Sequence, residues 1–384
     1  MTATPADRPI RVLQVSKHYR PVTGGVETVV EQLVSGIESV SFRVLTATER
    51  GRGGVDSVDG VPVVRAGTLG SVKSTPLAPS FPVRLRRQAE WADIVHYHLP
   101  FPVGPVSHLL ARIDAPTVVT FHDDIVGKGP VVYPYRPVLD RFLRGADRLL
   151  VTSPNMRDEC ETVAPFAEKT TVIPLGIDAD ETAAEPRRPE GRHVLFVGRL
   201  VPFKGVATLL AAMERVDGSL SVVGTGPERG ALERQAERRG LTDRVTFEGF
   251  VSEARLDRLY READAFVLPS VGANESFGIV QLEAMQRGLP VVNTDLPTGV
   301  PYVSVDGETG RTVPPGDPEA LAAAVEGVLG DPDRYERFSA NAIRRVRREF
   351  TSDRLLRETE AVYREVLDEG GSAGTRDEAG SAGI

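Results

Sequence analysis

The sequence is poor in cysteine and in long apolar runs. Its 384 residues include one cysteine, Cys160, which excludes an intrachain disulfide framework and a metal knuckle built on Cys-x-x-Cys pairs. A single thiol is typical of a reducing compartment. No run approaches the roughly 18 apolar residues of a membrane-spanning helix, and residues 1–9 lack the apolar core of a signal peptide. We therefore expect a cytoplasmic protein.

Cations are also in deficit, and few of them are lysine. The chain has 46 Lys and Arg against 54 Asp and Glu, a net charge of −8. This balance argues against a nucleic-acid-binding protein, which needs a surplus of cations for phosphate contacts. Local clusters of arginine can still meet an anionic surface. The lysines stand only at Lys17, Lys73, Lys128, Lys169 and Lys204.

The length of 384 residues exceeds the roughly 250–300 at which a single core usually splits, so two domains are expected. Short apolar runs alternate with segments of helical spacing, a pattern that predicts parallel sheets covered by helices. The fold class is therefore α/β, with two doubly wound, Rossmann-like domains and ligands in the crevice between them, at the C-terminal strand ends. Strands are expected at 10–16, 42–45, 61–64, 93–98, 117–122, 148–152 and 172–176, and again at 193–198, 219–224, 245–249, 265–268 and 290–293.

The domain boundary is expected in a stretch rich in Pro, Glu and Ala at 178–191. The predicted domains are 1–177 and 178–351. Helices are expected at 318–329, 333–350 and 352–367. The tail at 370–384 contains Gly, Ser, Ala and charged residues, a composition that predicts disorder.

The stretch 269–285 combines a strand end, a loop and a helix start. Backbone N–H groups at a helix start lack internal partners, so Phe277, Gly278 and Ile279 form a candidate anion site. Glu275 precedes residues 277–279, the corner between loop and helix. Glu283 lies four residues beyond Ile279, about 6 Å further along the helix. A nucleotide sugar suits this arrangement, with the diphosphate at the corner, the ribose against Glu283 and the hexose against Glu275. The alternative is a loop acid and an ordinary helical glutamate.

A second candidate site follows the first strand of the second half. Gly198 and Arg199 leave the strand, and Lys204 follows before the next helix. An arginine can hold a phosphate with two hydrogen bonds and a lysine adds a point charge, which a departing diphosphate needs when no metal is held. The alternative is a solvated pair of cations.

Glycines mark two further places where a backbone can approach a phosphate. Gly224 and Gly226 follow a strand, but Arg229 stands where the dinucleotide-binding fingerprint needs its third glycine. Gly24 and Gly25 precede a helix in the first half, where the N–H groups at the helix start can face a phosphate.

Histidines and paired aspartates give weaker signals. His122 ends a strand, where it can bond a sugar hydroxyl or a leaving phosphate, or be satisfied by its neighbours. His96 and His98 alternate with Tyr97 and share one sheet face, yet no third ligand accompanies them at a metal-binding spacing. The Asp-x-Asp segments 178–180 and 331–333 do not end apolar strands. No metal site is expected.

With these motifs in place, the chain resembles the retaining GT-B glycosyltransferases of family 4, relatives of glycogen synthase and phosphatidylinositol mannosyltransferase. The resemblance covers nearly the whole chain. It rests on Gly24 to Glu27, His122, Gly198 to Gly205, Gly224 to Gly226 and the pair Glu275 and Glu283.

The resemblance implies a role for each motif. Arg199 and Lys204 would hold the donor diphosphate, Glu283 the ribose, and Glu275 with the backbone of 277–279 the transferred sugar. It also implies that Gly25 lies near the phosphates, His122 at the sugar, and Phe250 and Val251 near the base. The last helix, about 352–368, would cross back onto the first domain.

The implied activity is transfer of a hexose with retention, by front-face attack that needs no enzymic nucleophile. The donor would be a nucleoside-diphosphate sugar, with mannose or glucose as first choice, and no other cofactor is expected. The acceptor would be a glycan or a lipid-linked glycan in the assembly of a surface polysaccharide or glycoprotein. A nucleotide-sugar epimerase of the same fold and a non-catalytic scaffold are the alternatives.

Two arginine-rich segments suggest a peripheral contact with anionic lipid at the inner face of the membrane. Solvated arginine faces are the alternative. The first segment combines Phe81, Val83 and Leu85 with Arg84, Arg86 and Arg87, and the second contains Arg136, Arg141, Arg144 and Arg148.

Overall fold

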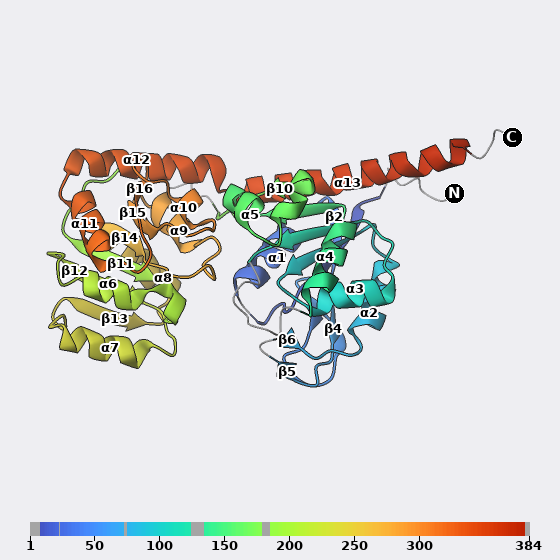
Figure 1. The fold of residues 1–384 in the computed structure, drawn as a ribbon, viewed down its shortest axis with the longest axis horizontal. Coiled ribbons are helices and arrows are strands. Elements are labelled where there is room, and N and C mark those ends of the chain that lie inside the picture. Colours follow the sequence, from blue (N-terminus) through green and yellow to red (C-terminus); the bar gives the residue numbers. More distant parts are fainter. Residues whose placement is uncertain (1–7, 23, 73–74, 124–133, 179–184, 381–384) are drawn as a thin grey trace. The chain divides into compact units, whose positions relative to one another are not determined.

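The structure is a computed structural model that describes residues 8–22, 24–72, 75–123, 134–178 and 185–380 (Figure 1). It divides into two compact units, and the predicted pair of doubly wound α/β domains is confirmed. Unit 1 comprises Met1–Thr152, Glu161–Ile173 and Asp353–Ile384, and unit 2 comprises Ser153–Cys160 and Pro174–Ser352. The sequence predicted one boundary near residue 177 and did not predict that Ser153–Cys160 joins unit 2.

Unit 1 contains an eight-stranded sheet in the order β10-β9-β8-β7-β1-β2-β4-β3. All neighbours are parallel except β3 and β4 at one edge. The winding reverses between β1 and β7, where ligands bind in such folds. The strands are β1 (Ile10–Val15), β2 (Val40–Ala47), β3 (Gly54–Val58), β4 (Val61–Ala66), β7 (Ile94–Leu99), β8 (Thr117–Phe121), β9 (Arg148–Val151) and β10 (Thr170–Val172), and a separate hairpin pairs β5 (Ser71–Val72) with β6 (Thr75–Pro76).

Helices cover both faces of this sheet because side chains alternate along each strand. On β7, the Tyr97 side chain meets His108 of α3 and Phe142 of α4, whereas His96 meets Tyr363 of α13 on the opposite face. The helices of unit 1 are α1 (Gly25–Gly36), α2 (Phe81–Ala89), α3 (Val103–Ala111), α4 (Arg136–Gly145), the 3₁₀ helix η3 (Ala164–Lys169) and α13 (Ser352–Gly380).

Unit 2 contains a six-stranded, all-parallel sheet in the order β13-β12-β11-β14-β15-β16. The chain winds outward from β11 through β12 and β13, then returns to β14 on the other side of β11. The carboxyl ends of β11 and β14 are therefore the switch point of this sheet. The strands are β11 (His193–Val197), β12 (Ser219–Val223), β13 (Val245–Gly249), β14 (Ala265–Leu268), β15 (Val291–Thr294) and β16 (Gly310–Val313).

The core of unit 2 forms two layers, one on each face of the sheet. Val194 and Phe196 of β11 belong to one layer, and Leu195 and Val197 to the other. This burial on both faces explains why the strands are continuous apolar runs. The helices are α5 (Pro154–Glu159), the 3₁₀ helix η4 (Pro202–Lys204), α6 (Val206–Ala212), α7 (Arg229–Arg238), α8 (Glu253–Glu262), α9 (Val280–Gln286), α10 (Val300–Val303), α11 (Pro318–Leu329) and α12 (Pro332–Glu349).

Some elements differ from the sequence-based expectations. Strand β10 lies at Thr170–Val172 rather than at 172–176, and the edge strand β3 and the short strands β5, β6 and β16 were not predicted. Helix α13 continues to Gly380, whereas disorder was expected from Gly370. Extending an existing helix needs no new nucleus, and the added segment includes the good helix formers Ala, Glu and Arg. Residues 381–384 lie outside the described chain.

Candidate active site

The centre of the candidate site is an ion pair between Lys204 and Glu275. Lys204 ends η4 in the connection after β11, and Glu275 lies in the connection after β14. Their Nζ and Oε2 atoms are in direct contact, and the side chains are only 13% and 9% exposed. Because β11 and β14 are neighbours in the sheet, the pair lies at the switch point of unit 2.

The two loops are held together by a close backbone approach at Gly205. This glycine has a φ of +69°, and a Cβ atom there would lie 1.9 Å from the carbonyl oxygen of Pro269. The Val271 amide also donates to the Phe203 carbonyl over 2.8 Å. Only glycine satisfies both the left-handed backbone and the contact, so Gly205 allows Lys204 to reach Glu275.

Glu275 is fixed by a second set of contacts on its own side of the pair. The Ser270 hydroxyl donates to Glu275 Oε2 over 3.0 Å. The Thr294 hydroxyl, at the end of β15, donates to the Ser270 carbonyl over 2.6 Å. The carboxylate thus has a set position before any ligand arrives.

Arg199 differs from Lys204 in its environment. It follows β11 directly and is exposed to solvent. Within the described chain its guanidinium makes no ion pair or hydrogen bond. The two predicted phosphate-binding cations therefore lie in the same connection, one paired at the switch point and one with all its donors available.

Glu283 lies in α9 and is held by residues that the sequence did not single out. The Tyr260 hydroxyl of α8 donates to Glu283 Oε2 over 2.7 Å. Burial raises the pKa of Glu283, while the Tyr260 hydrogen bond and Arg287 act in the opposite direction. Arg287 in turn pairs with Asp257 at 2.8 Å. No described residue bonds the other carboxylate oxygen, Oε1, so it remains available as an acceptor.

The glycine motifs of unit 2 serve packing between loops. A Cβ on Gly224 would lie 2.0 Å from the Gly198 carbonyl oxygen, and one on Gly226 would lie 2.2 Å from that of Leu200. The Leu200 amide also donates to the Thr225 carbonyl over 2.9 Å. The spacing of these glycines therefore has a structural cause, whether or not a ligand also touches them.

The corner before α9 starts a helix of seven residues, Val280–Gln286. Gly278 has a φ of +72°, Phe277 is buried in the core, and Ile279 packs against the same core layer. At the end of β13, Phe250 is 91% exposed while Val251 is partly buried. An aromatic ring so exposed at a carboxyl strand end is a candidate surface for stacking.

In unit 1, Gly24 and Gly25 begin α1 as predicted. Gly24 is the N-cap with an extended backbone, and a Cβ on Gly25 would meet open space. The backbone of Gly25 is thus accessible, although residue 23 beside it lies outside the described chain.

His122 belongs to a buried network that the sequence did not reveal. Its Nε2 lies 2.9 Å from His98 Nδ1, and His98 Nε2 lies 2.7 Å from Gln14 Oε1. The Gln14 amide then donates to the Tyr363 hydroxyl over 3.1 Å. Tyr363 also contacts His96 Nδ1 at 2.7 Å, and His96 Nε2 contacts the Thr120 hydroxyl at 2.7 Å.

The network determines where each proton lies. Burial lowers the pKa of His96 to about 3 and that of His122 to about 4, and it lowers the pKa of His98 well below its ordinary value. All three rings are therefore neutral near pH 7. Gln14 Oε1 can only accept, so His98 carries its proton on Nε2 and accepts on Nδ1. His122 must then donate from Nε2, which leaves its Nδ1 as an acceptor.

Across the ranges that the structure describes, no group of three or more His, Cys, Asp and Glu residues has the arrangement needed to hold a metal ion. Among the helices of the described residues, none combines the length and apolar character needed to cross a bilayer.

Both halves of the chain match models of protein families. Residues 178–345 match the model described as glycosyl transferases group 1, and residues 23–181 match glycosyltransferase family 4. The chain is 31% identical to O-antigen chain mannosyltransferase C of Escherichia coli, over 94% of this chain and 99% of that protein. It is 35% identical to D-rhamnosyltransferase WbpZ of Pseudomonas aeruginosa, over 89% of this chain and 93% of that protein.

Solved structures agree with the fold. Sucrose-phosphate synthase from Thermosynechococcus elongatus matches with a TM-score of 0.75 and 24% identity, over 94% of this chain and 100% of that one. HepE of Anabaena, solved with UDP and glucose, matches with a TM-score of 0.73 and 21% identity, over 93% and 100%. These likenesses confirm the predicted GT-B fold class.

The packing at Gly205 predicts an unequal cost for two glycine substitutions. Gly205→Ala and Gly240→Ala each place alanine at nearly the same left-handed φ, +69° and +68°, but a Cβ on Gly240 meets nothing within 4 Å. We expect Gly240→Ala to lower the free energy of unfolding by about 1–2 kcal/mol and Gly205→Ala to lower it by clearly more. Urea unfolding of both variants measures the difference, and equal costs would contradict the close approach at Pro269.

The buried network in unit 1 predicts that the Tyr363 hydroxyl stabilises the fold. Tyr363→Phe leaves the Gln14 amide and a His96 nitrogen without their partner, at a cost of about 1–3 kcal/mol in the free energy of unfolding. The matched control is Tyr335→Phe, because the Tyr335 hydroxyl is buried with no hydrogen-bond partner among the described residues. Urea unfolding should show a loss for the first variant and no loss for the second. The reverse order would refute the network.

Proposed function

We propose a function from one premise: the chain belongs to the glycosyltransferases, group 1 and family 4. It is an enzyme that transfers glycosyl groups. Relatives that span nearly the whole chain are named for the transfer of mannose or D-rhamnose, the 6-deoxy form of mannose. The proposed reaction moves a hexose of the mannose type from a nucleoside-diphosphate donor to a glycan or lipid-linked acceptor, in the assembly of a surface polysaccharide.

The observation that carries this proposal is the Lys204–Glu275 pair at the switch point of unit 2. Negative charge builds on the diphosphate as the bond to the sugar breaks, and a fixed ammonium stabilises that charge. An ammonium has three donors, so Lys204 can keep Glu275 and still donate to a phosphate oxygen. Glu275 has a fixed carboxylate that can accept from hydroxyls of the transferred sugar.

The remaining donor contacts follow from the surroundings of the pair. Arg199 adds a guanidinium for the diphosphate, and the backbone at Gly278 adds N–H groups beside it. Glu283 Oε1 accepts from the ribose hydroxyls while Tyr260 holds Oε2. The exposed Phe250 ring offers a stacking surface for the base.

The transfer is proposed to retain the anomeric configuration. Front-face attack needs stabilisation of the leaving diphosphate rather than an enzymic nucleophile, and Arg199 and Lys204 supply that charge without a metal. In unit 1, His122 presents a neutral acceptor nitrogen that can bond a sugar hydroxyl. The donor can be identified by a thermal-shift screen with GDP-, UDP- and ADP-sugars, and retention by NMR of the product anomer.

The ion pair makes Lys204 both structural and functional, and a pair of variants separates these roles. Lys204→Met should abolish transfer and also destabilise the fold by about 3–5 kcal/mol, because it leaves the Glu275 carboxylate buried and unpaired. The double variant Lys204→Met with Glu275→Gln removes both charges. Urea unfolding of the double variant should show that most of the lost unfolding free energy is recovered. Its glycosyl transfer, measured as release of the nucleotide from the donor, should not recover. Near-normal transfer by a variant without Lys204 would remove the diphosphate assignment.

Arg199 provides a test without a stability cost, because it is exposed and makes no bond within the described residues. Arg199→Ala should unfold like wild type and lower the transfer rate by about a hundredfold, a typical loss for one stabilising donor. The control is Arg238→Ala, an exposed arginine at the end of α7. Product analysis without an acceptor belongs in the same assay, since conversion of the donor to another nucleotide sugar would instead identify an epimerase.

The contact with anionic lipid is proposed for α2 rather than for the second arginine-rich segment, which comprises α4 and Arg148 at the start of β9. Helix α2 buries Phe81, Leu85 and Ala89 in unit 1, and on its outer side Val83 is 64% exposed beside exposed Arg86 and Arg87. The second segment is partly neutralised, because Arg136 pairs with Asp140 at 3.0 Å and Arg148 with Glu369 at 2.7 Å. An apolar residue flanked by exposed cations suits the cytoplasmic face of a membrane.

Vesicle sedimentation tests this contact. The protein should sediment with vesicles containing phosphatidylglycerol and stay in solution with phosphatidylcholine alone, and Arg86→Glu with Arg87→Glu should abolish binding. The paired control reverses the charge of Arg141 and Arg144 on α4 and should bind like wild type. Loss of binding in the control alone would move the contact to α4, and no binding by the wild type would end the proposal.

A further inference from the structure

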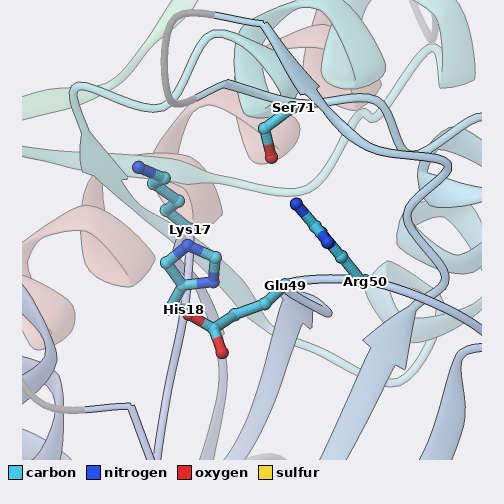
Figure 2. A pocket seen from close by; sticks show the side chains of 5 residues that line it. All are labelled: Lys17, His18, Glu49, Arg50 and Ser71. Atoms are coloured by element: carbon cyan, nitrogen blue, oxygen red, sulfur yellow. The ribbon is translucent and has the colours of Figure 1, made fainter.

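Unit 1 contains a cavity of about 770 Å³ that no donor contact uses. It is lined by Lys17, His18, Glu49, Arg50 and Ser71 (Figure 2). Figure 2 shows the Ser71 hydroxyl and the Arg50 guanidinium turned toward the same space, with Lys17 on its other side and the Glu49 carboxylate beside the His18 ring. Cavities of roughly 300–1,000 Å³ hold small ligands, so this one is large enough for a sugar and a charged group together.

The cavity lies at the carboxyl ends of neighbouring strands. Lys17 and His18 follow β1, and Glu49 and Arg50 follow β2, which pairs with β1 in parallel. In open α/β sheets this edge is where ligands bind. Ser71 comes from the separate hairpin of β5 and β6.

The backbone that carries the first two side chains is fixed. The Ala47 amide and the Thr46 hydroxyl both donate to the Lys17 carbonyl, over 3.2 and 2.9 Å. The Ser16 hydroxyl donates to the His18 carbonyl over 2.6 Å. Lys17 and His18 therefore start from defined positions.

The backbone that carries Arg50 is fixed in the same way. Gly51 next to it exchanges two backbone hydrogen bonds with Thr68, of 3.1 and 3.0 Å, and the Thr48 amide donates to the Ala66 carbonyl over 2.9 Å. The segment with Glu49 and Arg50 is thus anchored on both sides. Side chains on a fixed backbone lose less conformational freedom when a ligand binds.

The charge of the cavity favours an anion. Among the described residues that line it, Lys17 and Arg50 outnumber the carboxylate of Glu49. Within the described chain Arg50 makes no ion pair, although nearby arginines of unit 1 do: Arg20 pairs with Glu31, and Arg65 with Asp56 at 3.1 Å. An arginine fork, an ammonium and a hydroxyl together match the donors that a phosphate group needs.

We propose that this cavity binds a phosphate group of the acceptor, so that the acceptor is a phosphorylated saccharide rather than a neutral one. The inference rests on the proposed function, because it assigns the acceptor to unit 1. Arg50 holds the phosphate with two hydrogen bonds, Lys17 adds a point charge and Ser71 donates its hydroxyl. The phosphate can belong to a soluble sugar phosphate or to the diphosphate of a lipid-linked glycan, since both present the same oxygens.

Acceptor kinetics test the assignment with three acceptors: methyl mannoside, mannose 1-phosphate and a mannosyl diphosphate on a short prenyl chain. Both phosphorylated acceptors should have a KM at least about tenfold below that of methyl mannoside. Preference for the prenyl compound alone would assign the site to a lipid-linked diphosphate. Equal use of the neutral acceptor would overturn the proposal.

Variants locate the effect. Arg50→Ala and Lys17→Ala should each raise the KM for the phosphorylated acceptor by about tenfold and leave the donor KM and the urea midpoint unchanged. The matched control is Arg52→Ala, an exposed arginine two residues away that does not line the cavity. A change in donor KM instead would assign the cavity to the donor diphosphate and refute the acceptor site.

Binding of inorganic phosphate keeps this inference separate from the proposed function. Calorimetry with GDP or UDP present at saturation occupies the donor site, so remaining phosphate binding reports the cavity. Phosphate should bind wild type and Arg52→Ala, and bind Arg50→Ala at least about tenfold more weakly. If the protein binds nucleotide and turns over but Arg50→Ala changes neither phosphate binding nor acceptor KM, this inference alone is refuted. If the wild type neither binds nucleotide nor turns over, the proposed function is refuted.

Discussion

The ammonium of Lys204 reaches the carboxylate of Glu275 only because two loops approach at a residue without a side chain. Both groups are largely withdrawn from water, and a charge so placed is costly unless it is paired. The backbone contact between Gly205 and Pro269 brings the charges together, and the Ser270 hydroxyl then fixes the acid. The donor chemistry proposed for unit 2 therefore depends on a steric condition satisfied by one glycine.

In unit 1, the buried polar groups are stabilised by hydrogen bonds between neutral groups rather than by an ion pair. Its network of Gln14, His96, His98 and Tyr363 contains no charge, because burial keeps each imidazole neutral. Hydrogen bonds alone then set which nitrogen of His122 accepts. A fixed cation suits the leaving diphosphate, whereas a neutral acceptor suits a hydroxyl, so the two units differ in electrostatics as their proposed ligands differ.

The sequence could identify the charged residues because each follows an apolar strand, and strand ends are visible in a hydrophobic pattern. This holds for Lys204 and Glu275, whereas the close approach of their two loops at Gly205 was not predicted. Their partners could not be identified. Tyr260 has the spacing of a core residue, and nothing in that spacing shows that its hydroxyl meets Glu283. Gln14 and Tyr363 are 349 residues apart, and only the packing of α13 on the sheet joins them.

The glycine motifs show why the family was easier to identify than the substrate. Gly224 and Gly226 are required because a Cβ on either would collide with the backbone of residues 198–200. These two motif positions therefore reflect the packing between the loops. The charges beside them are proposed to act on the diphosphate and ribose, groups that all nucleotide sugars share. The choice of sugar and acceptor must therefore lie in side chains outside the motifs. In unit 1, Lys17 and Arg50 are the side chains proposed for this choice, because they line the cavity without belonging to any glycine motif.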